Sequence, residues 1–391
     1  MKKNGRLLLL AGLFYGCNIN AQSVLPQAVA DAVKVVEKNL KPDHQSQFFK
    51  VTPLSADSVL VETTSRDAAQ RFDSLLPNTP KKIKILPESF SDNKNFGIVT
   101  LSVTNHRAEP AQAGEMLTQA LMGTTVRILK QTKNGYYLVQ TPDNYIAYVE
   151  TPGIVRVTEA EKNSWETTEK LVFTALYGTV YSEKKETSLP VSDVVAGDQL
   201  KLIGKKGKFF QVQYPNGKTG YVRKKDAQKY SDWLAQTQPY FPNLLSTGEK
   251  LLGVPYLWGG TSIKGVDCSG FVRAVFLLNG VLLPRDASQQ ARVGAAVDVF
   301  ENGVFNMQKA LKTLAPGDLL FFGTKRDDGS DRVTHVAMYI GDGRFIQSSG
   351  SVKISDFLPS SPDYDAAHMS QFLGARNVLS HIGEQGIAPL K

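Results

Sequence analysis

The chain has 391 residues, more than one hydrophobic core usually organises, so we expect two to four domains that each bury a core. Its composition is that of an ordinary globular protein, with 42% hydrophobic and 21% charged residues. The formal net charge of +8 fits attraction to an acidic cell-wall polymer or to anionic lipid, and it fits plain solubility better. No basic run is interleaved with aromatic residues, which argues against a nucleic-acid-binding protein.

The first residues have the pattern of a secretion signal. Basic residues precede an apolar run over residues 7–17, and Ala21 offers a cleavage junction, which predicts a signal peptide over residues 1–21. The apolar run is too short to serve as a stable membrane anchor, so we expect no transmembrane span after its removal. The alternative is a lipoprotein acylated at Cys17, which the bulky residues before that cysteine disfavour. Both versions predict an exported protein of the periplasm or cell envelope.

Residues 22–104 combine one expected helix with several expected strands, which predicts a small α/β module. The helix is expected over residues 24–39, and the strands over residues 49–52, 58–63, 82–86 and 98–103. The module holds no cluster of histidines, cysteines or paired carboxylates, so the sequence predicts no role for it.

An internal repeat follows. Three strand-like blocks return at a near-constant offset of 73 or 74 residues, and the pairs begin at Val126 and Leu200, at Tyr136 and Phe209, and at Ile146 and Thr219. Each block is short, rich in β-branched or aromatic residues and bounded by turn residues, which predicts two small all-β barrels over residues 105–158 and 165–228. These modules resemble bacterial SH3-like domains, a kind found on secreted cell-wall enzymes.

The last domain, expected over residues 240–382, carries a candidate nucleophile. Cys268 is the one cysteine beyond the predicted signal, and an unpaired cysteine in an exported protein needs a reason. It follows Asp267, which suits a helix N-cap, and precedes an apolar run over residues 271–278. A helix N-terminus stabilises the thiolate that attacks carbonyl groups. The alternative is a buried cysteine that acts as a small hydrophobic residue.

A candidate base lies further along the chain. The histidines are His44, His106, His335, His368 and His381. Among them, His335 lies in a well-formed strand over residues 333–340, which ends in Gly341-Asp342-Gly343 and is followed by a second strand. A strand histidine alone is more often structural, but together with an upstream helix-capping cysteine it predicts a Cys-His pair.

Five motifs in this domain occur in the order typical of the NlpC/p60 family of bacterial cell-wall cysteine peptidases, which residues 240–380 therefore resemble. The motifs are Tyr256-Leu257-Trp258-Gly259-Gly260, Asp267-Cys268-Ser269-Gly270, Leu283-Pro284-Arg285-Asp286, Pro316-Gly317-Asp318-Leu319 and Thr334-His335-Val336-Ala337. The resemblance implies a multidomain α+β protein with a papain-like α+β peptidase domain at its C-terminal end. It also implies acyl transfer by Cys268 and His335. We expect no cofactor, and no metal, because one cysteine and scattered histidines do not make a ligand set.

The resemblance assigns further roles around that pair. It implies that Tyr256 donates a hydroxyl beside the oxyanion, and that Asp267, Ser269, Arg285 and Asp286 contact the substrate. A helix cap, a polar first turn and an exposed loop are the structural alternatives for these residues.

The third catalytic residue departs from the family pattern. Members most often carry a second histidine there, whereas the matching place, 12 residues beyond His335, holds Gln347. A glutamine can accept the ring N–H and fix the tautomer, but it brings no charge to support an imidazolium. A two-residue turn at residues 342–343 would put Gln347 on the opposite face from His335, whereas a three-residue loop would set Ala337 opposite Gln347 and bring both side chains to one face. A triad therefore predicts the three-residue loop.

Family members with tandem SH3-like modules cut γ-D-glutamyl bonds in peptidoglycan stem peptides. In such proteins the first module can read a free N-terminal L-alanine with an acidic group and a tyrosine, for which Glu109, Glu115, Tyr145 and Tyr148 are the candidates here. The resemblance thus implies a dipeptidyl-peptidase VI-like enzyme acting on L-Ala-γ-D-Glu-diamino acid fragments, and we separately expect a monomer. The alternatives are an endopeptidase or amidase acting on intact peptidoglycan and a non-catalytic cell-wall-binding protein in which Gln347 marks a decayed site.

Overall fold

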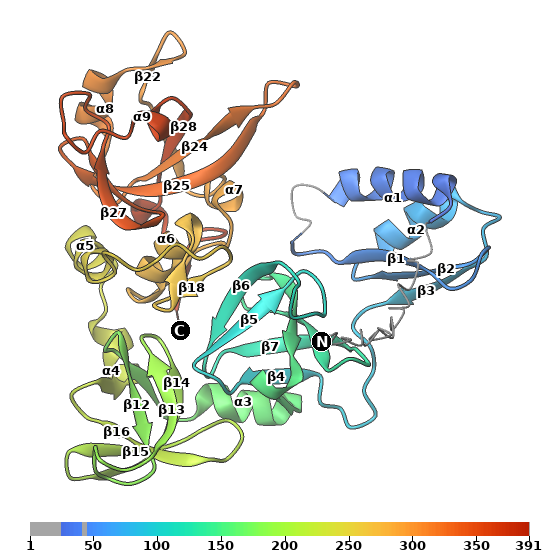
Figure 1. Ribbon diagram of the computed structural model, residues 1–391, viewed down its shortest axis with the longest axis horizontal. Coiled ribbons are helices and arrows are strands. Elements are labelled where there is room, and N and C mark those ends of the chain that lie inside the picture. Colours follow the sequence, from blue (N-terminus) through green and yellow to red (C-terminus); the bar gives the residue numbers. More distant parts are fainter. Residues whose placement is uncertain (1–24, 41–44, 391) are drawn as a thin grey trace, which may run out of the picture. The chain divides into compact units, whose positions relative to one another are not determined.

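Figure 1 shows the computed structural model of the chain, which describes residues 25–40 and 45–390. The predicted signal peptide over residues 1–21, with Cys17, lies outside the described residues. The chain divides into two compact units, Met1–Ile85 and Leu86–Lys391. Within the part that the structure describes, no helix is both long and apolar enough to cross a membrane.

The first unit packs two helices on one face of a three-stranded sheet (Figure 1). Its elements are α1 (Gln27–Leu40), β1 (Phe49–Pro53), β2 (Val59–Thr63), α2 (Arg66–Leu75) and β3 (Lys81–Ile85). The central strand β2 pairs antiparallel with β1 and parallel with β3, and Phe72 of α2 is fully buried in the core. Helix α2 was not among the expected elements, because its charged residues conceal a narrow apolar face; the Ser65 side chain caps its start.

The expected boundary between residues 104 and 105 is wrong, since the first barrel begins earlier. Strand β4 (Phe96–Val99) pairs with β7 (Thr125–Gln131) and with β10 (Ile154–Val157), so it belongs to the barrel. The single strand expected over residues 98–103 is broken by a bend, after which the chain continues as β5 (Val103–Arg107).

The two barrels repeat one strand order. The first sheet runs β10-β4-β7-β8-β9-β5-β6, and the second, read in the matching direction, runs β17-β11-β14-β15-β16-β12-β13. The repeated sequence blocks are therefore equivalent strands. The remaining elements are β6 (Met116–Leu121), β8 (Tyr136–Gln140), β9 (Ile146–Glu150), η1 (Thr151–Gly153), α3 (Glu159–Thr167), β11 (Lys170–Phe173), β12 (Tyr177–Tyr181), β13 (Pro190–Val195), β14 (Gln199–Lys206), β15 (Phe209–Gln213), β16 (Thr219–Arg223), β17 (Ala227–Lys229) and α4 (Tyr230–Gln236).

The C-terminal domain places a helix against an antiparallel six-stranded sheet of order β21-β28-β24-β25-β26-β27. Its elements are α5 (Phe241–Lys250), β18 (Thr261–Ser262), β19 (Gly265–Val266), α6 (Cys268–Leu277), β20 (Val281–Leu282), α7 (Ala287–Gln290), β21 (Ala295–Val297), β22 (Phe300–Glu301), β23 (Val304–Phe305), α8 (Met307–Thr313), β24 (Leu319–Lys325), β25 (Asp331–Gly341), β26 (Arg344–Ser349), β27 (Ser351–Asp356), α9 (Ala366–Met369), β28 (Phe372–Asn377), η2 (Leu379–His381) and β29 (Ala388–Pro389). Strand β29 pairs with β20, so the domain extends past residue 382, where it was expected to end.

Two apolar clusters fix this sheet. On one side, Phe271 and Val275 of α6 pack in one buried cluster with Val336 of β25 and Ile346 of β26. A second cluster includes Phe322 and residues of α8. The sheet strands that carry His335 and Gln347 are thus held rigidly against the helix that begins at the cysteine.

Candidate active site

Cys268 is the first residue of α6. The Asp267 side chain caps the helix by accepting the Gly270 N–H at 2.7 Å. The sulfur is buried and approaches the Thr334 carbonyl oxygen at 4.0 Å, and the N–H groups of Ser269 and Val336 favour its thiolate. Burial, and next the Asp267 charge, outweigh these groups and raise the pKa of Cys268 to about 11. The resting group is therefore a thiol, which needs a base before it can attack.

His335 and Gln347 are brought to one face by an unexpected hairpin. Asp342 and Gly343 form a two-residue turn, with φ of 54° and 86°, and Gly341 pairs with Arg344. A bulge between Tyr339 and Gly341 then shifts the register, so that Met338 lies opposite Ile346. Continued by one residue, this pairing sets Ala337 opposite Gln347. The expected register is present, but the three-residue loop predicted to produce it is wrong, since a bulge supplies the extra residue instead.

The hydrogen bonds of Gln347 fix the tautomer of His335. The buried Gln347 Nε2 donates to Asp365 Oδ2 at 2.7 Å and to Ser355 Oγ at 2.9 Å. A charged carboxylate can only accept, so the amide nitrogen must face Asp365, and Gln347 Oε1 is left facing His335 Nε2 at 2.7 Å. That ring nitrogen must then carry the proton, which leaves Nδ1 free to accept one. Burial, and next the neighbouring His368, lower the pKa of His335 to about 4, so the resting ring is neutral.

Tyr256 stays protonated beside the cysteine. Burial, and next the negative charge of a Cys268 thiolate, raise the pKa of Tyr256 to about 12. The loop that carries this tyrosine is fixed by its N–H, which donates to the Gly350 carbonyl at 2.9 Å. Its phenol is therefore available as a hydrogen-bond donor at neutral pH.

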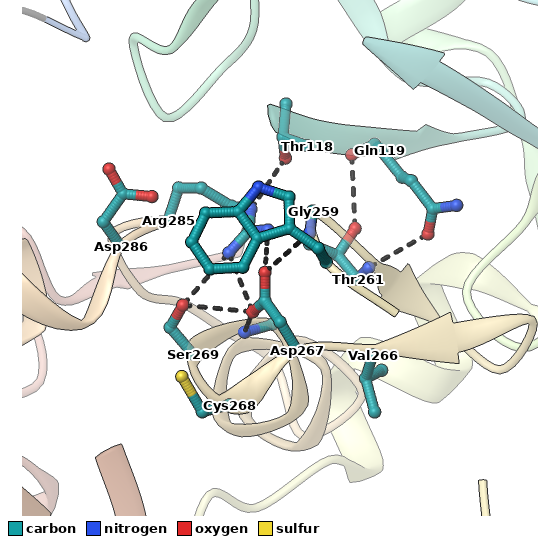
Figure 2. Close-up of polar contacts among 12 residues, drawn as sticks. Thr118, Gln119, Gly259, Thr261, Val266, Asp267, Cys268, Ser269, Arg285 and Asp286 are labelled. Atoms are coloured by element: carbon teal, nitrogen blue, oxygen red, sulfur yellow. Dashed lines mark hydrogen bonds and ion pairs between the residues drawn. The ribbon is translucent and has the colours of Figure 1, made fainter. Parts of the chain in front are cut away.

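Arg285 and Asp267 form a buried ion pair within the peptidase domain, and Arg285 also reaches the first barrel (Figure 2). The guanidinium donates to both Asp267 oxygens, at 2.5 and 3.1 Å, and to Ser269 Oγ at 3.0 Å, while its Nε donates to Thr118 Oγ1 of β6 at 3.1 Å. Figure 2 shows Asp267 at the centre of these contacts, where it also accepts the Gly259 N–H. Three predicted substrate contacts are thus partners of one another, and they stabilise the turn that presents Cys268.

The first barrel contributes two further side chains to this region. Glu115 accepts the indole N–H of Trp258 at 2.8 Å, and the Tyr145 hydroxyl donates to Asp286 Oδ2 at 3.5 Å. Burial raises the pKa of Asp286 to about 6, although the Arg285 guanidinium opposes that shift. A neighbouring cation would therefore strongly favour the ionised form of Asp286.

Of the four barrel candidates, the structure brings Glu115 and Tyr145 to the peptidase domain. Tyr148 is a buried residue of β9, and Glu109 is exposed between β5 and β6. Gln119 of β6, which was not predicted, accepts the Thr261 N–H at 2.9 Å and the Ser262 hydroxyl at 2.9 Å. No local pattern marked Gln119, because its partners come from a domain more than a hundred residues away.

Comparison with known proteins identifies the family. Residues 253–374 match the NlpC/P60 family and residues 106–154 match the bacterial dipeptidyl-peptidase Sh3 domain. The gamma-D-glutamyl-L-lysine dipeptidyl-peptidase of Bacillus cereus is 32% identical over 276 residues, which cover 68% of this chain and 76% of that protein. The chain belongs to the NlpC/P60 family. The assignment predicted from five motifs is thus confirmed.

Other relatives agree with this assignment. Dipeptidyl-peptidase 6 of Lysinibacillus sphaericus is 28% identical over 257 residues, covering 64% of this NlpC/P60 protein and 87% of that relative. A crystal structure of a Bacillus cereus NlpC/P60 family protein superposes with a TM-score of 0.59 at 26% identity, covering 73% of this chain and 99% of that one. These likenesses extend beyond the length of the peptidase domain, and the names of the relatives support a peptidase.

Proposed function

We propose that this chain is an exported cysteine peptidase that hydrolyses the γ-D-glutamyl to diamino acid bond of peptidoglycan stem peptides. Its substrates would be trimmed fragments with a free N-terminal L-alanine, from which it releases L-Ala-γ-D-Glu. The observation that carries the proposal is that two side chains of the first barrel contact the peptidase domain, Tyr145 at Asp286 and Glu115 at Trp258. The name of the Bacillus cereus relative, a gamma-D-glutamyl-L-lysine dipeptidyl-peptidase, supports the same bond.

The reaction would begin with proton transfer from the Cys268 sulfur to Nδ1 of His335, the ring nitrogen that Gln347 leaves free. The thiolate then attacks the γ-glutamyl carbonyl. The oxyanion that forms can accept the Cys268 N–H, which has no partner within the helix because it lies in the first turn, and the Tyr256 hydroxyl. His335 returns the proton to the leaving amine, and water releases the acyl group.

The free amine of the substrate would be read by charge. An alanine ammonium beside Asp286 would pair with its carboxylate, and Tyr145 and Glu115 add a hydroxyl and a second carboxylate from the barrel. Burial of Asp286 strengthens such a pair, because the carboxylate is poorly solvated. Acetylation of the substrate would remove the positive charge and leave Asp286 without its partner.

The test is mass spectrometry of L-Ala-γ-D-Glu-diaminopimelate incubated with the mature protein, alongside the same peptide acetylated at its N-terminus. Release of L-Ala-γ-D-Glu from the free peptide alone, abolished in Cys268→Ala and weakened in Asp286→Asn, supports the proposal. Cleavage of both peptides would mean that the amine is not read, which favours activity on intact peptidoglycan. Cleavage of neither would favour another amide substrate or a binding protein.

Export is tested separately, by the mature N-terminus of protein recovered from the cell envelope. A chain that begins at Gln22 supports signal cleavage, and a lipid-modified Cys17 supports the anchored form. Full-length protein retained in the cytoplasm would contradict export.

A further inference from the structure

Asp365 joins Gln347 to a second histidine. Its Oδ2 accepts from Gln347 Nε2 and from His368 Nδ1, each at 2.7 Å, and its Oδ1 accepts the His368 N–H at 3.1 Å and so caps α9. The His368 ring lies against the His335 ring, with centroids 4.2 Å apart and planes inclined by 33°. Asp365 thus stands two hydrogen bonds behind His335, while His368 covers a face of the imidazole.

This arrangement places the negative charge of Asp365 directly behind Gln347, which is itself neutral. When His335 takes the thiol proton it becomes a cation in a buried site, where an uncompensated charge is costly. Gln347 can orient the ring but cannot balance that charge. Burial disfavours ionisation of Asp365, yet the hydrogen bonds from Gln347 and His368 outweigh it and hold the pKa of Asp365 below its ordinary value. Asp365 is therefore a carboxylate at neutral pH.

We propose that Asp365 is a positioning residue for the peptidase reaction, whose charge acts through the Gln347 amide to stabilise the His335 imidazolium. His368 holds Asp365 in place and packs against the ring. The proton moves from the Cys268 sulfur to Nδ1 and later to the leaving amine, and Asp365 stays ionised throughout. This inference rests on the proposed function, because it requires Cys268 and His335 to react as a pair.

Among the described residues, no other charge near the His335 ring can take the place of the Asp365 carboxylate. The titratable groups that act on His335 are His368, which opposes the imidazolium, and Asp365 and Asp267, which favour it. Asp267 is already neutralised by Arg285, whereas Asp365 is joined to the ring through one amide. Loss of the Asp365 charge should therefore leave the imidazolium with the Gln347 hydrogen bond but without its largest favourable charge.

The variant Asp365→Asn removes the charge and keeps the shape of the side chain. Asparagine caps helices as well as aspartate does, but its one oxygen cannot serve both the α9 cap and Gln347, which Oδ1 and Oδ2 of Asp365 serve separately. The loss of a Gln347 hydrogen bond therefore needs its own control. Two matched controls are available. Ser355→Ala removes the other acceptor of the same Gln347 nitrogen without changing the charge, and Asp363→Asn removes a carboxylate from an exposed neighbour in sequence. Should Asp365→Asn unfold, Asp365→Ser keeps a capping side chain and also lacks the charge.

Two readouts are needed, the rate of Cys268 alkylation by iodoacetamide as a function of pH and kcat/KM for the free stem peptide. In Asp365→Asn we expect both to fall roughly 10-fold or more near pH 7, because each pKa unit of lost imidazolium stabilisation is a factor of about 10. Above the pKa of the thiol the alkylation rates should converge on those of the wild type, because no base is then required. Ser355→Ala and Asp363→Asn should change both quantities far less.

Two results would overturn the inference. An alkylation profile unchanged in Asp365→Asn would show that its charge does not reach His335, and equal losses in Ser355→Ala and Asp365→Asn would show that only the orientation of Gln347 matters. The alkylation readout needs no substrate. If the wild-type protein cleaves no stem peptide, the proposed function fails while the comparison of profiles still decides the role of Asp365.

Discussion

At the scale of single residues, the site depends on a buried charge pair that lies beside the reacting atoms. Arg285 is 2% exposed, and each of its nitrogens donates to a partner in the barrel or the peptidase domain. A buried ion pair adds little to stability compared with apolar residues, but removing one member leaves an uncompensated charge. The chief role of Arg285 is therefore to neutralise the buried carboxylate of Asp267, which caps the helix that begins at Cys268.

The variant Arg285→Leu should lower the free energy of unfolding by about 3–5 kcal/mol, because it leaves the Asp267 carboxylate buried and unpaired. Chemical denaturation of the unit from residue 86 onward measures this. Arg344→Leu is the control, since Arg344 and its partner Asp342 are exposed and such pairs contribute about 1 kcal/mol at most. A loss in Arg285→Leu no larger than in the control would show that Asp267 finds another partner.

A second residue should make stability depend on pH. His106 is fully buried in the first barrel, and burial lowers its pKa to about 4, against an ordinary value of 6.5. As the pH falls from about 6.5 to 4, the unfolded chain takes up a proton at this histidine and the folded chain does not, so the folded state loses about 3 kcal/mol of stability. In His106→Leu, the unfolding free energy measured across this range should fall less steeply. Parallel curves for the two proteins would contradict the prediction.

At the scale of elements, the hairpin of β25 and β26 decides whether His335 can meet Gln347. Its register depends on a two-residue turn and a bulge, because one residue more or less would send the two side chains to opposite faces. Gly343 is essential to that turn. Its φ is 86°, and a Cβ there would lie 2.6 Å from Leu358 Cγ.

The variant Gly343→Ala should displace the turn and slow cleavage, with a loss of at least about 1 kcal/mol of stability from the left-handed backbone alone. Gly329→Ala separates the two effects, since Gly329 also has a positive φ of 79° but no atom within 4 Å of an added Cβ. Activity and thermal midpoint should fall further in Gly343→Ala than in Gly329→Ala. Equal effects would show that the contact with Leu358 has no part in fixing the register.

The elements also explain which residues of the candidate site could be predicted from the sequence. Cys268 and His335 were predictable because each carries a local signal, a capped apolar helix and a β-branched strand, and Gln347 follows from its place 12 residues beyond His335. The bulge beside Tyr339 was not predictable, because Gly341-Asp342-Gly343 suits both a two-residue turn and a three-residue loop. Asp365 lies 18 residues beyond Gln347 in a short loop, and nothing in its neighbours marks it. Tertiary packing brings such partners together, and it leaves no periodic pattern in the sequence that would predict them.

At the scale of the whole molecule, every residue of the candidate site lies in the unit Leu86–Lys391. The N-terminal unit has an apolar core of its own, built from α1, α2 and the strands between them. The two units therefore have the means to fold independently.

A chain that begins at Leu86 should keep the thermal midpoint of its unit and the kcat/KM of the full chain for stem peptide. Differential scanning calorimetry and a peptide cleavage assay, with the full chain as the control, measure this. A marked loss of activity in the shortened chain would mean that residues 1–85 take part in catalysis or in substrate binding.

The contacts of Glu115 and Tyr145 with the peptidase domain also bear on how such a gene can change. One wall of the site is encoded before residue 158 and the nucleophile after residue 240, with the whole second barrel between them. A recombination event anywhere in that interval would exchange Glu115 and Tyr145 and leave Cys268, His335 and Asp286 in place. Lineages carrying this architecture could thus acquire new selectivity by shuffling a module, without a single substitution around the cysteine.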